Sequence, residues 1–159
     1  MSQKSNATRV VKVFLSYAHQ DEEFKDKLLS HLSPLRRQGL IESWDDRKIR
    51  AGGIWDEEIL KHFNEADVIL CLISADFINS EYCHEVEMKR AWERRELEKV
   101  KIIPILLRHV DWLKTPFRRL QAIPRDNKPV TGYGNRDKAF MEIAQEIGII
   151  IDNLGMENP

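Results

Sequence analysis

The segment DVILCLIS, residues 67–74, is the most continuous apolar run in the chain and constrains the fold more than any other feature. Successive residues of a strand face opposite sides of the sheet, so a continuous apolar run needs cover on both faces. This is typical of the centre of a parallel sheet. Parallel strands need crossover connections, and these are usually helices. The run therefore predicts an α/β fold with helices on both faces of the sheet.

Strands and helices are predicted to alternate along the rest of the chain. The predicted strands are residues 10–15, 40–44, 67–74, 100–107 and 128–133. The predicted helices are residues 21–35, 54–66, 75–98 and 136–154, and Gly155 is a plausible helix stop. We expect one domain over residues 9–154, a disordered segment at 1–8, and a tail or junction to a missing domain at 155–159.

The charge and composition of the chain indicate which classes of binding partner and which compartment to expect. The chain has 25 basic and 26 acidic residues and a net charge of −1, which predicts no direct nucleic-acid partner and no membrane partner. No apolar stretch approaches the roughly 20 residues of a membrane span. Cys71 and Cys83 do not form a disulfide framework, and the polar N-terminus is no secretion signal, so we expect a cytoplasmic protein.

The sequence lacks the motifs of several common functional sites. The chain has no glycine-rich dinucleotide or phosphate-binding loop, no serine nucleophile elbow and no paired metal-binding motif, and its five histidines are scattered. No metal site is predicted. A phosphorelay receiver has a similar sheet, but Pro104 and Arg108 leave no lysine where a receiver needs one.

Four segments, taken in order, resemble the TIR domain family, and bacterial members in particular. They are FLSYAHQD (14–21), ESWDDRKIRAGGIWDEEI (42–59), DVILCLISADFINSEYCHEVEMKRA (67–91) and IIPILLRHVDW with PF and LQAIP (102–124). The resemblance covers about residues 9–150. It implies a flavodoxin-like, three-layer α/β/α fold with a five-stranded parallel sheet and helices on both faces.

The resemblance also implies two functional classes. Many bacterial and plant members cleave NAD⁺ at the nicotinamide–ribose bond after self-assembly, whereas many animal members are adaptors that act through TIR–TIR contacts. We expect an NAD⁺ glycohydrolase or cyclase in bacterial anti-phage defence, with NAD⁺ as substrate and no further cofactor. The expected partners are other TIR domains and a fused or associated sensor. A non-catalytic interaction module and a transferase acting on a nucleoside N-glycosidic bond are the alternatives.

A glutamate after the third strand carries the chemistry in enzymatic members of the family. Cleavage produces an oxocarbenium-like ribose, which a neighbouring carboxylate stabilises. The usual Cys-x-x-Glu spacing falls on Val86 here, and the bacterial Y-C-x-x-x-E-M-K-R-A pattern selects Glu87. Glu85 is the second candidate. It ranks below Glu87 because its position four residues before Lys89 suits a surface ion pair. Glu81 is interpreted as a helix-start acid.

Further substrate-binding residues are predicted at the strand ends and in the loops that follow them, where parallel α/β sheets bind ligands. Tyr82 can be a core aromatic or a ring-stacking wall, Trp55 can be a core or interface aromatic, and Phe14 can pack in the core. Ser74 can cap the local backbone, and Arg108 can form an ion pair instead of meeting a phosphate. Cys83 is expected to line the site. Gly52 and Gly53 are expected either to let the loop move over a ligand or to form a turn before the next helix. The predicted substrate-binding residues are Phe14, Ser16, Tyr17, Trp44, Asp45, Asp46, Gly53, Trp55, Ser74, Tyr82 and Cys83.

Overall fold

The computed structural model describes residues 9–45, 55–79, 88–97 and 100–157. Its strands are β1 (Val11–Ser16), β2 (Ile41–Trp44), β3 (Val68–Ile73) and β4 (Lys101–Leu106). Its helices are α2 (Glu22–His31), α3 (Ser33–Arg37), α4 (Trp55–Glu65), α5 (Ala75–Asn79), α6 (Met88–Glu96) and α7 (Arg136–Glu157). Short 3₁₀ helices are η1 (His19–Asp21), η4 (Trp112–Lys114), η5 (Pro116–Arg119) and η6 (Val130–Gly132).

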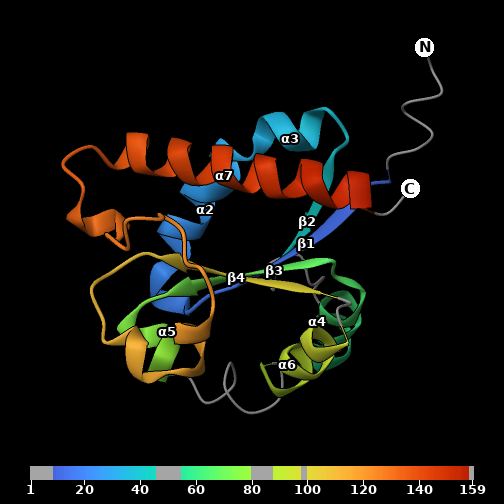
Figure 1. Ribbon diagram of the computed structural model, residues 1–159, viewed down its shortest axis with the longest axis horizontal. Helices are drawn as coiled ribbons and strands as arrows, with labels where there is room; N and C mark the ends of the chain where they lie inside the picture. The colour runs from blue at the N-terminus through green and yellow to red at the C-terminus, as the bar shows by residue number, and fades with distance from the viewer. Residues whose placement is uncertain (1–8, 46–54, 80–87, 98–99, 158–159) are drawn as a thin grey trace.

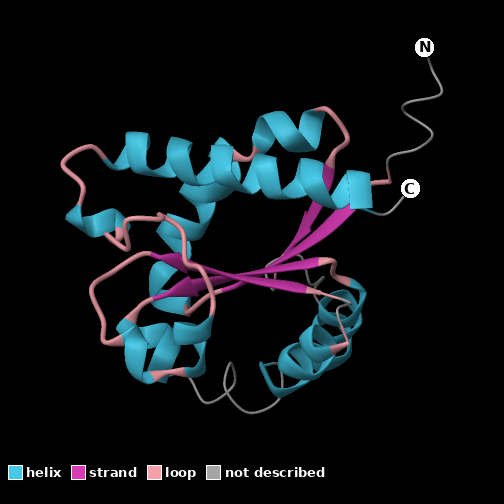
Figure 2. Ribbon diagram, viewed as in Figure 1, coloured by secondary structure: helices cyan, strands magenta, loops and turns pink. Residues whose placement is uncertain are grey.

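The four strands form one parallel sheet in the order β2-β1-β3-β4, and helices cover both of its faces (Figures 1 and 2). Helices α2, α3 and α7 lie on one face, and α4, α5 and α6 lie on the other (Figure 1). The fold class predicted from the sequence, a parallel α/β sheet between two helical layers, is confirmed.

Strand β3 lies inside the sheet and is buried along its whole length, as its apolar run predicts. Its side chains alternate between two cores. Val68, Leu70 and Leu72 pack with residues of α2 and α7, whereas Ile69, Cys71 and Ile73 pack with residues of α4 and α5. Two separate cores on opposite faces explain why neither face of this strand carries a polar residue.

The prediction of a fifth strand at residues 128–133 is wrong, since this segment contains η6. Among the described residues the sheet has four strands. An isolated parallel bridge joins Ile123 to Ile105 beside β4, where Ile123 N–H donates to Pro104 O and Leu106 N–H donates to Ile123 O, both at 2.9 Å. Pro124 is the next residue. Because proline has no backbone N–H, it cannot donate the hydrogen bond that would extend this pairing along β4.

Pro104 predicted a bulge or a position near the sheet edge, and β4 is one of the two edge strands among the described residues. The Pro104 carbonyl accepts from Ile123, on the side of β4 that faces away from β3. In a strand the N–H and C=O of one residue point to the same side. The missing N–H of Pro104 therefore removes no hydrogen bond to β3.

Two predicted helix boundaries differ from the structure. The helix predicted over residues 21–35 is divided into α2 and α3, because Pro34 has no N–H to donate to the preceding turn and Ser33 Oγ donates to Ser30 O at 2.8 Å. Gly155 does not stop the last helix, which continues to Glu157. A glycine costs a helix only about 1 kcal/mol. No helix in the described residues is both long and apolar enough to cross a membrane.

Candidate functional site

The ends of the parallel strands bring several predicted site residues to one edge of the sheet. Phe14 pairs in register with Trp44, and Ser16 pairs with Cys71, three residues before Ser74. Trp44 is the last residue of β2, and Asp45 follows it. The carboxyl edge, defined here by Phe14, Ser16, Tyr17, Trp44, Asp45 and Ser74, is where ligands bind in open α/β sheets.

A column of stacked rings holds Trp44 at this edge. The Trp44 ring lies 5.6 Å from the Phe14 ring and 4.2 Å from the His62 ring, with interplanar angles of 23° and 14°. Phe14 also meets Phe63 edge to face at 5.3 Å. Phe14 is buried and serves as a core aromatic, whereas Trp44 is half-buried.

A buried lysine connects α2 to the end of β2. Lys25 Nζ lies 3.5 Å from Asp45 Oδ1 and 2.9 Å from Asp26 Oδ1, and its exposed fraction is only 2%. The ammonium also lies 5.1 Å from the centre of the Tyr17 ring. Asp45 and Tyr17, both predicted to contact substrate, are therefore engaged inside the protein. Their substrate contacts remain predictions.

Sequence reasoning missed Lys25. A lysine within a helix is normally solvated, and nothing local indicates its partner Asp45, 20 residues further along. A signal was present: Lys25 lies three residues before Leu28 and seven before Leu32, the spacing of the buried helix face. A charge at such a position requires a buried counter-charge.

A second network, centred on the buried carboxylate of Asp21, joins η1 to the residues that follow β3 and β4. Ser74 Oγ donates a hydrogen bond to Asp21 Oδ2, and Arg108 Nε donates to Asp21 Oδ1 at 2.8 Å. Phe77 N–H donates to Ser74 Oγ at 3.1 Å, which confirms the backbone-capping interpretation of Ser74. The ion-pair interpretation of Arg108 is likewise confirmed. Because Asp21 and Ser74 are both buried, this network fixes the start of α5 against the carboxyl edge.

The variant Ser74→Ala is expected to lower the free energy of unfolding by roughly 1–3 kcal/mol, because it leaves Asp21 and the Phe77 N–H short of a buried partner. Urea unfolding measures the change. Ser30→Ala is the matched control, since the exposed Ser30 hydroxyl only donates to Asp26 O at 3.1 Å. Equal losses in the two variants would contradict a structural role for the Ser74 hydroxyl.

The remaining predicted site residues lie outside the described residues. They are Glu85, Glu87, Asp46, Gly53, Tyr82 and Cys83. Trp55 begins α4, but its side chain is also outside the description. Along the chain, residues 80–87 connect α5 to α6, and Glu87 directly precedes the first residue of α6. Within the described ranges, no group of three His, Cys, Asp or Glu residues is suited to hold a metal ion.

Comparison with known proteins identifies the family. A profile of the TIR domain matches residues 13–140, from within β1 into α7. The chain belongs to the TIR domain family. An uncharacterized protein of Sinorhizobium fredii, y4lF, is 48% identical to this TIR domain over 135 residues, which are 85% of this chain and 42% of that protein. The chain thus spans less than half the length of the curated relative.

Solved structures support the same fold. The TIR domain of the Toll-related receptor TRR-2 from Hydra magnipapillata is 20% identical, with a TM-score of 0.61 over 88% of this chain and 97% of that one. The TIR domains of the activated Roq1 resistosome, which recognizes the pathogen effector XopQ, are 17% identical, with a TM-score of 0.59 over 86% and 99%. At these identities the likeness concerns the fold alone.

Proposed function

We propose that this TIR domain is an NAD⁺ glycohydrolase or cyclase that self-assembly activates, and that it serves bacterial immune defence in the cytoplasm beside a sensor. The observation that supports the proposal best is the fixed start of α5. Ser74, bound to Asp21 and to the Phe77 N–H, holds α5 at the carboxyl edge. The chain then leads from α5 into the acidic segment that contains Glu85 and Glu87.

The proposed reaction breaks the C–N bond between ribose and nicotinamide. The bonding electrons leave with nicotinamide, which becomes neutral, so no general acid is required. The ribose acquires oxocarbenium character, and the Glu87 carboxylate stabilises its positive charge. A water molecule then attacks and loses a proton to give ADP-ribose, or a nucleophile within the ADP-ribose closes a ring.

The described residues take supporting roles in this proposal. Trp44 presents a half-buried ring at the carboxyl edge, held by its stacking on Phe14 and His62. Asp45, paired with Lys25, fixes the point at which residues 46–54 leave β2. Phe14, Tyr17 and Ser74 are buried, so they act as positioning residues that set the shape of the edge.

Assembly makes the proposed activity depend on concentration. While only a small fraction of chains is assembled, a tenfold rise in protein concentration should raise nicotinamide release per chain by about tenfold, if the active species is a dimer. Nicotinamide release and light scattering, measured on the same samples, test this. A constant rate per chain in a demonstrably monomeric sample would contradict activation by assembly.

A non-catalytic TIR–TIR module is the alternative, and the same samples distinguish it. Assembled protein that releases no nicotinamide would favour the module. The other alternative, a transferase, predicts base-exchange products when free base acceptors are added. Mass spectrometry of the products separates this outcome from hydrolysis or cyclisation.

A further inference from the structure

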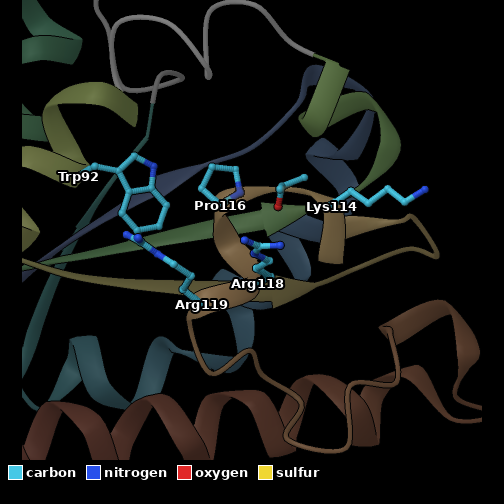
Figure 3. Close-up of a pocket in the computed structure, with 6 residues that line it drawn as sticks. Trp92, Lys114, Pro116, Arg118 and Arg119 are labelled. Atoms are coloured by element: carbon cyan, nitrogen blue, oxygen red, sulfur yellow. The ribbon is translucent and has the colours of Figure 1, made fainter.

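A hollow of about 450 Å³ lies on the surface between α6 and the connection that contains η4 and η5 (Figure 3). We name it the basic hollow, and its lining residues are Trp92, Lys114, Thr115, Pro116, Arg118 and Arg119. Three of the six are basic and none is acidic. The volume falls in the range of about 300–1,000 Å³ that small-molecule sites occupy.

The backbone under the basic hollow is anchored. Phe117, between Pro116 and Arg118, is buried and contacts the rings of Phe77 and Trp92 at 6.0 and 5.8 Å. Thr115 Oγ1 donates to Trp112 O at 2.6 Å and accepts from Phe117 N–H at 3.2 Å. Phe117 therefore fixes η5 to the core, and Thr115 caps its start. Arg118 and Arg119 both belong to this anchored helix.

The cations of the basic hollow have few carboxylate partners in the described part of the chain. Arg9, Arg108 and Arg125 each contact a carboxylate at 3.1 Å or less. By contrast, Arg118 and Arg119 have no ion pair with any described residue, and Lys114 pairs only with exposed Asp111 at 3.4 Å. Like charges in one concave surface repel one another, and a bound anion relieves that repulsion.

Trp92 places an aromatic ring beside the basic side chains of the hollow. The Arg119 guanidinium carbon lies 5.7 Å from the centre of the Trp92 ring, and Figure 3 shows the arginine beside the indole, with Arg118 and Lys114 further along the hollow. Arginine binds phosphate through its planar fork of donors, and a tryptophan face stacks on a nucleobase. Aromatic and phosphate-binding groups therefore lie side by side.

We propose that the basic hollow binds a nucleotide, with its phosphates on Arg118, Arg119 and Lys114 and its base against Trp92. None of these residues is among those proposed to bind or cleave NAD⁺, so the proposal uses a separate set of side chains. A nucleotide fits better than a peptide phosphate, because the aromatic wall gives its base a surface to stack on.

The Trp92 indole N–H resonance provides a local readout of binding. The chain has four tryptophans, and comparison with Trp92→Phe assigns the indole signal. The titrants are ADP, pyrophosphate, inorganic phosphate and adenosine at constant ionic strength. ADP should shift the Trp92 signal saturably and bind about tenfold more tightly than pyrophosphate, because stacking adds to the phosphate contacts. Inorganic phosphate should bind more weakly still, and adenosine should leave the signal in place.

Paired variants test the residues. Arg118→Gln/Arg119→Gln should weaken ADP binding by at least about tenfold, since it removes charge-assisted hydrogen bonds. The control Lys27→Gln/Lys138→Gln removes the same charge from exposed positions on α2 and α7, and its affinity should match the parent's. An unchanged affinity in the arginine variant, or the absence of a saturable Trp92 shift, would overturn the proposal.

Two further results would also overturn it. Equal affinity for pyrophosphate and ADP would show that Trp92 does not recognise a base. A single-stranded oligonucleotide that binds more tightly than ADP and loses affinity in the arginine variant would identify the hollow as part of a nucleic-acid surface. Nicotinamide release by the arginine variant is measured separately, so a failure of this proposal is distinguishable from a failure of the proposed NAD⁺ chemistry.

Discussion

The variant Glu87→Gln is expected to lower nicotinamide release from NAD⁺ by roughly 10²–10³-fold in the assembled protein, because an amide cannot neutralise the developing positive charge on the ribose. The substitution keeps the size and hydrogen-bonding shape of the side chain. The loss should therefore appear in kcat, while thermal stability and assembly remain close to those of the parent. Chromatographic quantification of nicotinamide and ADP-ribose measures the effect.

Two control variants test whether the effect is specific to Glu87. Glu85→Gln tests the second candidate and should keep most of the activity if Glu85 is a surface ion-pair partner. Glu93→Gln removes an exposed carboxylate from α6, the helix that begins just after Glu87, and should behave like the parent. Full activity of Glu87→Gln, or a larger loss in Glu85→Gln, would contradict the assignment of Glu87.

The variant Lys25→Met is expected to lower the free energy of unfolding by about 3 kcal/mol, since it leaves the Asp45 carboxylate buried without its cation. Lys25 and Asp45 have side-chain exposed fractions of 2% and 4%. Methionine retains most of the volume of the lysine stem, so the loss reports the charge and not a cavity. Urea unfolding followed by circular dichroism measures it.

Lys27→Met is the matched control, because Lys27 lies two residues away on the same helix and is exposed. Its effect should be near zero, as for most surface substitutions. If the two variants lose stability equally, the Lys25–Asp45 pair contributes nothing specific. If Lys25→Met is as stable as the parent, Asp45 is compensated by its other contacts.

The candidate site was predictable from the sequence to different degrees. The strand ends that carry Phe14, Trp44 and Ser74 were identifiable because apolar runs end there, and parallel strands must end at one edge. The partners of these residues were not. Asp21 meets Ser74 and Arg108 across 53 and 87 positions of chain, and no local pattern encodes contacts over such separations.

The sheet illustrates the same limit. The apolar run at residues 67–74 was sufficient to predict a central strand, because only burial on both faces explains such a composition. The fifth strand was wrong because a short segment such as KPVTGY satisfies strand propensity and turn propensity equally well. Packing against α7 and the Leu107 carbonyl, which accepts from Thr131 N–H at 3.0 Å, decided in favour of η6.

The sequence by itself determined the alternation of strands and helices, the central position of β3 and the family resemblance, since each depends on residue type and short-range spacing. Only the tertiary structure decided how charges and rings combine. It buried Lys25 against Asp45, assigned Arg108 to Asp21, and brought Trp92 beside Arg119 in the basic hollow. The reason is physical: burial and Coulomb energies depend on distances in space, which are set by how the layers pack and not by neighbours along the chain.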